Sequence, residues 1–193
     1  MKFKNLLLSS LLLGAFALTG CSPQDSSKPA VPAKQEVSVE AVAAQAKGFA
    51  VGALMSSNTV YVFFDPQCPH CGHLWQASAP LQKKVKFVWI PVGWINATST
   101  AQAAALLSAA NPAALMSEHE ASLLAGTGGI SASSSIAPEV EQAIKKNTAM
   151  LNSFGAESVP FIVAKNLKTG QTVSRDGAME TVALAEFLGV DAP

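Results

Sequence analysis

The chain has 193 residues, and its 13 basic and 13 acidic side chains give a formal net charge of zero at pH 7. This balance provides no basic stripe for nucleic acid and no polybasic patch for a membrane surface. No internal repeat is visible. Behind its N-terminal segments the chain keeps roughly 155 residues, which is enough for one domain with a real core.

Residues 1–20 have the pattern of an export signal. A short basic start precedes the apolar stretch 6–18, which is too short to span a bilayer comfortably. The stretch ends in the sequence LTGC at 18–21, which resembles the lipobox of bacterial lipoproteins. The resemblance implies cleavage before Cys21 and lipidation of that cysteine, whereas an ordinary cleaved signal with an incidental cysteine is the alternative.

Residues 21–36 are predicted to form a flexible tether, because they are rich in Ser, Pro, Lys and Gln and offer almost nothing to bury. A single domain then covers 37–193. Several acyl chains on Cys21 would anchor this domain firmly. Ser22 resembles the residue found in lipoproteins sent on to the outer membrane, so we expect a periplasmic protein anchored to the outer rather than the inner membrane.

Periodicity within the domain predicts an α/β order of elements. The expected helices cover 37–55, 68–81, 98–110, 111–125, 138–151 and 179–188, and the expected strands cover 59–64, 85–92, 160–164 and 171–174. Asn111 and Pro112 are suited to cap and open the fourth helix, and 126–135 is expected to be a mobile connection. This order is typical of a thioredoxin-like fold, with a helical insertion between the βαβ unit and the C-terminal hairpin and helix.

Cys68 and Cys71 stand three residues apart where the strand 59–64 gives way to a helix. Their spacing places both sulfurs on one helix face, within bonding reach. Free backbone N–H groups and the helix dipole favour the thiolate of Cys68, while Cys71 is expected to be less exposed and to resolve a mixed disulfide on Cys68. With Cys21 assigned to a lipid, this pair is the remaining one, and it predicts a redox-active disulfide.

Three residues near the pair are expected to support it. Pro69 is a good first helical residue, and with His70 it would set the redox potential; a charged His70 imidazole would lower the pKa of Cys68. Asp65 is interpreted as a turn residue before Pro66, with a buried proton shuttle as the alternative. His73 raises the question of a Cu or Zn site, but ligands crowded into six residues project around the helix axis, so we expect no metal and no bound cofactor.

Three segments together resemble the catalytic domain of the periplasmic DsbC/DsbG thiol-disulfide proteins. They are 63–71, 90–93 with the Ala-rich helix after it, and 158–161. The resemblance implies that Pro160 has a cis peptide bond and lies against the dithiol, and that Val159 and Pro160 pair with a substrate strand. The dithiol sequence CPHC is itself more similar to that of the oxidase DsbA.

The resemblance also has a departure. DsbC and DsbG carry an N-terminal dimerisation domain, whereas here a short tether and one expected helix precede the strand 59–64, so we expect a monomer. The predicted function is thiol-disulfide exchange on cell-envelope proteins, with a membrane redox partner that reoxidises or reduces the dithiol. Oxidase, isomerase and reductase directions all stay open. The rival hypothesis is a non-catalytic envelope protein that binds Cu or Zn, or that binds peptides like a chaperone.

Overall fold

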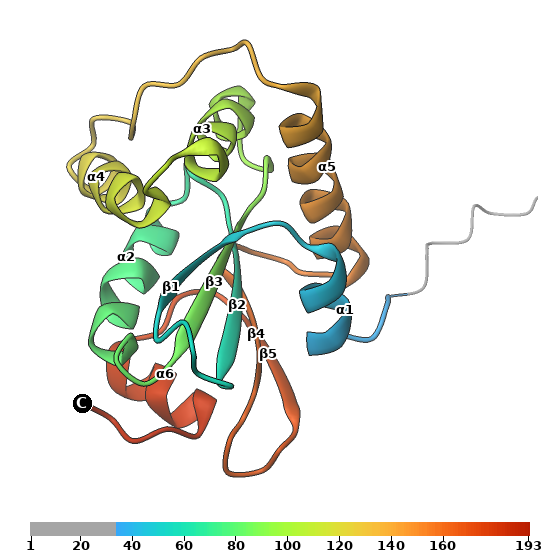
Figure 1. Ribbon diagram of the computed structural model, residues 1–193, viewed down its shortest axis with the longest axis vertical. Coiled ribbons are helices and arrows are strands. Elements are labelled where there is room, and N and C mark those ends of the chain that lie inside the picture. The colour runs from blue at the N-terminus through green and yellow to red at the C-terminus, as the bar shows by residue number, and fades with distance from the viewer. Residues whose placement is uncertain (1–33) are drawn as a thin grey trace, which may run out of the picture. The chain divides into compact units, whose positions relative to one another are not determined.

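The computed structural model describes residues 34–193, whose centre is a five-stranded mixed sheet with helices on both faces (Figure 1). The strands are β1 (Phe49–Gly52), β2 (Thr59–Phe64), β3 (Lys86–Pro91), β4 (Phe161–Lys165) and β5 (Thr172–Asp176). Their order in the sheet is β1-β3-β2-β4-β5. The central strands β2 and β3 run parallel, and every other neighbouring pair is antiparallel.

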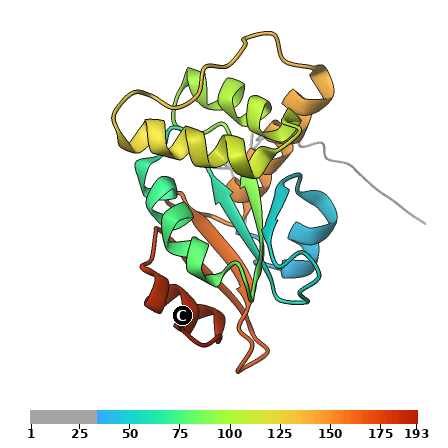
Figure 2. The ribbon, with the colours of Figure 1, turned by 60° about the vertical axis from the view of Figure 1, so that its left-hand side comes forward.

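Six α-helices in the described residues surround this sheet: α1 (Val39–Gln45), α2 (Pro69–Ser78), α3 (Ala97–Ser108), α4 (Pro112–Leu124), α5 (Pro138–Ser153) and α6 (Thr181–Leu188). Helices α2 and α6 cover one face, while α1 and α5 cover the other (Figure 1). Helices α3 and α4 form the predicted insertion, and α4 lies alongside α2 (Figure 2). Within 34–193, no helix combines the length and apolar character needed to cross a membrane.

The single helix predicted for 37–55 is wrong. The chain there forms the short helix α1 and then strand β1, which pairs antiparallel with β3. Gly48 permits this pairing, because a Cβ at that position would lie 2.4 Å from the carbonyl oxygen of Trp89. Phe49 and Val51 are buried and Ala50 is exposed, an alternation that suits a strand. A sheet contact distant in sequence therefore overrides the helical preference of this Ala-rich segment.

Consecutive aromatic residues of β2 build the core on opposite faces of the sheet. Phe64 packs edge-on against Trp89, with ring centroids 5.6 Å apart, and Trp89 packs in the same way against Trp75 of α2 at 5.1 Å. Phe63 contacts Phe154 and Phe161 on the other face, at 6.2 and 6.4 Å. Because successive side chains of a strand face opposite sides, aromatic rings pack against both faces of β2 at the end that leads to α2.

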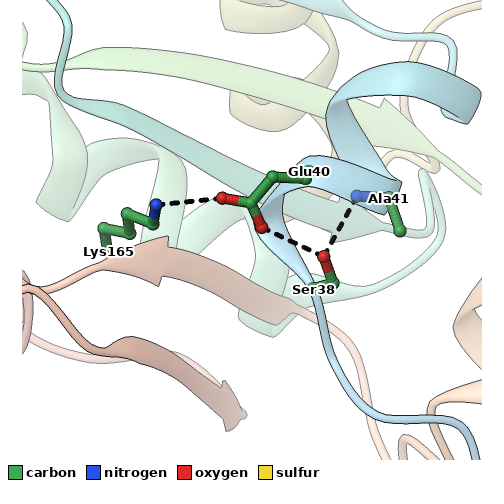
Figure 3. Close-up of polar contacts among 4 residues, drawn as sticks. All are labelled: Ser38, Glu40, Ala41 and Lys165. Atoms are coloured by element: carbon green, nitrogen blue, oxygen red, sulfur yellow. Dashed lines mark hydrogen bonds and ion pairs between the residues drawn. The ribbon is translucent and has the colours of Figure 1, made fainter.

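Helix α1 is held by polar contacts at its first turn (Figure 3). The Ser38 hydroxyl accepts a hydrogen bond from the Ala41 N–H at 3.2 Å and donates one to Glu40 at 3.1 Å. Glu40 also pairs with Lys165, the last residue of β4, at 2.9 Å. The hydrogen bond from Lys165 is the main reason that the pKa of Glu40 falls from 4.5 to about 2. These contacts connect α1 to the end of β4.

Candidate active site at the start of helix α2

Cys68 is the N-cap of α2, and Pro69 is the first helical residue. The N–H of Cys68 donates to the Asp65 carbonyl, and the N–H of Cys71 donates to the Cys68 carbonyl, both at 3.0 Å. No side chain caps the helix. The backbone N–H groups of His70 and Cys71 at this helix start still lower the pKa of Cys68, as the spacing of the motif predicts.

The two thiols have opposite electrostatic environments. Both cysteines are free, and Cys71 is fully buried while Cys68 keeps 5% of its surface exposed. A hydrogen bond from the Cys71 thiol is the largest influence on Cys68; together with the backbone N–H groups of Cys71 and His70, it lowers the pKa of Cys68 from 9.0 to about 7. Burial raises the pKa of Cys71 well above 9.0, and the neighbouring Cys68 raises it further. Cys68 is therefore the thiol that ionises near neutral pH.

The loop before β4 lies against the dithiol. The Cys68 thiol donates a hydrogen bond to the carbonyl oxygen of Val159, with the sulfur 3.3 Å from the oxygen. The Val159–Pro160 peptide bond is cis, as the family resemblance implies. Asp176 holds the start of this loop, because its carboxylate accepts hydrogen bonds from the N–H groups of Glu157 and Ser158 at 2.9 and 3.0 Å.

Asp65 does more than end β2 in a turn. It is fully buried, and each carboxylate oxygen accepts two hydrogen bonds. One oxygen receives the Gln67 N–H at 2.8 Å, as a turn residue would, and also the Ser99 hydroxyl at 2.7 Å. The other receives the N–H groups of Trp94 and Ile95 at 2.6 and 2.8 Å. Asp65 thus ties the loop after β3 and the start of α3 to the active-site turn.

The two histidines of the motif are both exposed, with their rings 6.0 Å apart. His70 contributes to the lowered pKa of Cys68 through its backbone N–H, and its imidazole is not among the causes. Across residues 34–193, no group of three or more His, Cys, Asp or Glu side chains is arranged to hold a metal ion.

Helix α4 brings two residues to the site that the sequence analysis did not assign to it. His119 is buried; one ring nitrogen lies 2.6 Å from the Pro66 carbonyl oxygen, and the other accepts the Ile130 N–H at 3.2 Å. Glu120 is buried against Gly72, the residue after Cys71. A signal for Glu120 was present, because a carboxylate at the helical spacing of Met116 and Leu124 interrupts an apolar stripe.

The connection at 126–135 is predicted to be mobile, but hydrogen bonds hold its first half against α3. Gln102 of α3 donates to the carbonyl oxygens of Gly128 and Ile130 at 2.9 and 2.8 Å. Its own side-chain oxygen accepts from Gln67 at 2.6 Å. The insertion is thereby joined by side-chain hydrogen bonds to the residue just before Cys68.

Comparison with curated proteins finds thiol:disulfide interchange proteins DsbG. The chain is 32% identical to DsbG of Pseudomonas aeruginosa over 147 residues, which cover 75% of this chain and 56% of that protein. It is 33% identical to DsbG of Escherichia coli over 105 residues, or 53% of this chain and 42% of that protein. The chain thus spans about half the length of these relatives. No family model matches.

Solved structures share the fold at lower identity. A thioredoxin-like oxidoreductase from Silicibacter pomeroyi has a TM-score of 0.62 at 17% identity, covering 79% of this chain and 96% of its own. A periplasmic thioredoxin-like protein from Salmonella enterica serovar Typhimurium has the same TM-score at 15% identity, with coverages of 80% and 97%. The described part of the chain therefore has an α/β thioredoxin-like fold with a helical insertion, and its sequence is similar to those of the DsbG proteins over about half of their length.

Proposed function

We propose that this protein is a thiol:disulfide interchange oxidoreductase in which Cys68 is the nucleophile and Cys71 the resolving thiol. The observation that carries the proposal is the difference between the two sulfurs, because only Cys68 has a pKa lowered to about 7, while that of Cys71 is raised by burial. The thiolate is the species that attacks a disulfide. Similarity to the DsbG proteins, which are named for this reaction, supports the same chemistry.

The reaction proceeds through a mixed disulfide. The Cys68 thiolate attacks a substrate disulfide, forms a new S–S bond and releases one substrate sulfur as a thiolate; Cys71 then attacks Cys68 and releases the other. The reverse sequence transfers the Cys68–Cys71 disulfide to a substrate dithiol. Pro69 keeps the helix start in place beneath Cys68.

Substrate binding is assigned to Val159 and Pro160. Their loop faces Cys68, as the hydrogen bond from Cys68 to the Val159 oxygen shows, so an extended substrate segment placed along it would bring its sulfur to Cys68. Trp94 and Ile95 are 37% and 48% exposed, and their backbone is held by Asp65 beside the same turn. We propose that they add an apolar border for that segment.

The proposed substrates are cell-envelope proteins with cysteines or disulfides, and the proposed compartment is the periplasm. The signal 1–20, the lipidated Cys21 and most of the tether 21–36 lie outside the described residues and remain predictions. The name of the Salmonella relative, a periplasmic protein, supports the compartment. Mass spectrometry of the mature N-terminus should find acylated Cys21, and an unmodified product cleaved elsewhere would refute the anchor.

The deciding experiment combines a reduction potential with single-turnover exchange on a dithiol peptide. An active oxidoreductase exchanges disulfides with the peptide and has a potential above the range of structural disulfides. A potential below about −300 mV with no exchange would instead favour the rival metal-binding or chaperone-like function.

A further inference from the structure

Glu120 is a buried carboxyl group for which the fold supplies no partner. Its side chain is 1% exposed, and neither carboxylate oxygen has a hydrogen-bond partner among the described residues. Burying an unpaired carboxylate costs far more free energy than burying a neutral side chain of similar size. Glu120 lies on the buried side of α4, as Met116 does. If packing were its only role, leucine or methionine at this position would make the fold more stable.

The carboxyl group lies against Gly72, the residue after Cys71. A Cβ built on Gly72 would be 2.6 Å from one Glu120 oxygen, and 3.2 Å from Leu124 on the next turn of α4. Any larger residue after Cys71 would push Glu120 away. The absence of a side chain at Gly72 thus leaves room for a carboxyl group beside the first turn of α2.

Few charged or titratable groups share this space. Cys68 and Cys71, at the start of α2, are close enough to Glu120 for their charges to interact with it, whereas His70 and His73 are exposed. On α4 itself, His119 points to Pro66 and Ile130, and Glu118 is exposed. Helix α3 and strand β1, which also pack against α4, carry no titratable side chain. Burial is the larger reason, and the charge of Cys68 the smaller one, that the pKa of Glu120 rises from 4.5 to about 8.

We propose that Glu120 is the proton acceptor for Cys71 when Cys71 resolves the mixed disulfide on Cys68. The inference rests on the proposed function. In this step the S–H bond of Cys71 breaks and its proton passes to the Glu120 carboxylate. The Cys71 sulfur forms the S–S bond with Cys68, and the substrate sulfur leaves with the electron pair of the broken disulfide bond. In the reverse direction, protonated Glu120 returns the proton to Cys71.

The charge on Cys68 controls at which stage Glu120 can accept the proton. In the reduced protein the Cys68 thiolate holds the pKa of Glu120 up, so the carboxyl group keeps its proton. Once Cys68 is part of a mixed disulfide, that negative charge is gone and the pKa of Glu120 falls. The carboxylate fraction of Glu120 therefore increases at the stage when Cys71 must lose a proton that burial otherwise holds tightly.

Stopped-flow reaction of the reduced protein with one equivalent of 5,5′-dithiobis(2-nitrobenzoate) separates the two steps. Attack by Cys68 releases the first coloured thiolate, and resolution by Cys71 releases the second. In Glu120→Gln, the first phase should stay within about twofold of wild type, while the second should slow at least tenfold near pH 7, at the lower end of typical general-base effects. The difference should shrink as the pH rises, because hydroxide then removes the Cys71 proton.

Two further variants sharpen the result. Glu120→Asp keeps a carboxyl group and should recover part of the second phase, whereas Glu118→Gln changes an exposed carboxyl of the same helix and should behave as wild type. An unchanged second phase with an unchanged pH profile in Glu120→Gln overturns the proton-acceptor role and leaves the proposed function intact. A wild-type protein that gives no second phase contradicts the proposed function itself.

An independent readout does not need turnover. Carbon-13 NMR of labelled glutamate side chains should show Glu120 titrating near pH 8 in the reduced protein, and at lower pH when Cys68 is blocked as an S-methyl disulfide in a Cys71→Ala background. A Glu120 that titrates at the same pH in both states overturns the coupling on which the proposal depends.

Discussion

Two buried carboxyl groups flank the dithiol, and they differ in almost everything except burial. Asp65, in the turn between β2 and α2, has four donors directed at its two oxygens. Glu120, in the helical insertion, has none among the described residues. A buried carboxylate with every oxygen paired stabilises a particular backbone arrangement, whereas one without partners is retained at a cost in stability. The comparison separates the part of the site that holds the fold from the part that serves chemistry.

Removing Asp65 should produce the largest effect on stability. Asp65→Ala leaves the N–H groups of Trp94 and Ile95 and the Ser99 hydroxyl without their acceptor, so the free energy of unfolding should fall by about 3 kcal/mol or more. Urea unfolding measures this loss. Asp191→Ala, which removes an exposed carboxyl, should stay within about 0.5 kcal/mol of wild type. A loss of unfolding free energy below about 1 kcal/mol for Asp65→Ala would contradict the claim that Asp65 stabilises the fold.

Glu120 should make the wild-type protein less stable as the pH rises. Its pKa is about 8 in the folded protein and 4.5 without the fold, so the folded state holds the extra proton between these values. The stabilisation is complete below pH 4.5 and is lost as the pH rises towards 8. Within this window each pH unit lowers the unfolding free energy of the wild-type protein by up to about 1.4 kcal/mol. We therefore expect the difference in unfolding free energy between Glu120→Gln and wild type to grow by about 2 kcal/mol from pH 5 to 7.

The interval from pH 5 to 7 lies below the range in which Cys68 acts in the opposite sense. The pKa of Cys68 is lowered from 9.0 to about 7, so its contribution to stability is present above pH 9 and is lost as the pH falls through 7. Glu118→Gln is the matched control, and its urea midpoints should follow the wild-type pH dependence. A Glu120→Gln protein with the wild-type slope would show that Glu120 is ionised at pH 5 despite its burial.

The pKa of Cys68 should depend mainly on Cys71. The Cys71 thiol makes the main hydrogen bond that lowers the pKa of Cys68, so Cys71→Ala should raise the thiolate titration midpoint from about 7 by about one unit. Ultraviolet thiolate absorbance against pH gives the midpoint, with Cys68→Ala as the blank. Cys71→Ala should also trap a substrate mixed disulfide that Cys68→Ala does not. Equal trapping by both variants would contradict the assigned roles.

His70 should have the smallest effect. Its imidazole is exposed and only its backbone N–H lowers the pKa of Cys68, so His70→Ala should move the Cys68 midpoint by less than about 0.3 units. The same absorbance titration tests this, with His73→Ala as a second exposed histidine for comparison. If the pKa of Cys68 rose by a full unit in His70→Ala but not in His73→Ala, the result would support the original prediction that a charged His70 imidazole lowers this pKa.

The local part of the site could be predicted from the sequence. The order of β2 and α2, the N-cap position of Cys68 and the burial of Cys71 follow from an apolar run, a proline and a three-residue spacing. The cap and first residue of α4, Asn111 and Pro112, are confirmed for the same reason. Each depends on interactions within about one helical turn, which are encoded by neighbouring residues.

The errors and omissions have a different origin. The helix predicted across 37–55 gives way to β1 because β3, more than 30 positions later, supplies the pairing edge. Asp65 resembles an ordinary turn residue until the loop at Trp94 and Ile95 folds onto it. In both cases a distant segment decides what local propensity leaves undecided.

The sequence by itself determined the strand, the dithiol and the start of the helix, because these depend on contacts between near neighbours. Only the tertiary structure decided which charges face the two sulfurs. The insertion brings Glu120 from 49 residues beyond Cys71 to the side of Gly72. No pattern in the chain specifies that approach, because packing of α4 against α2 is a property of two whole helix surfaces.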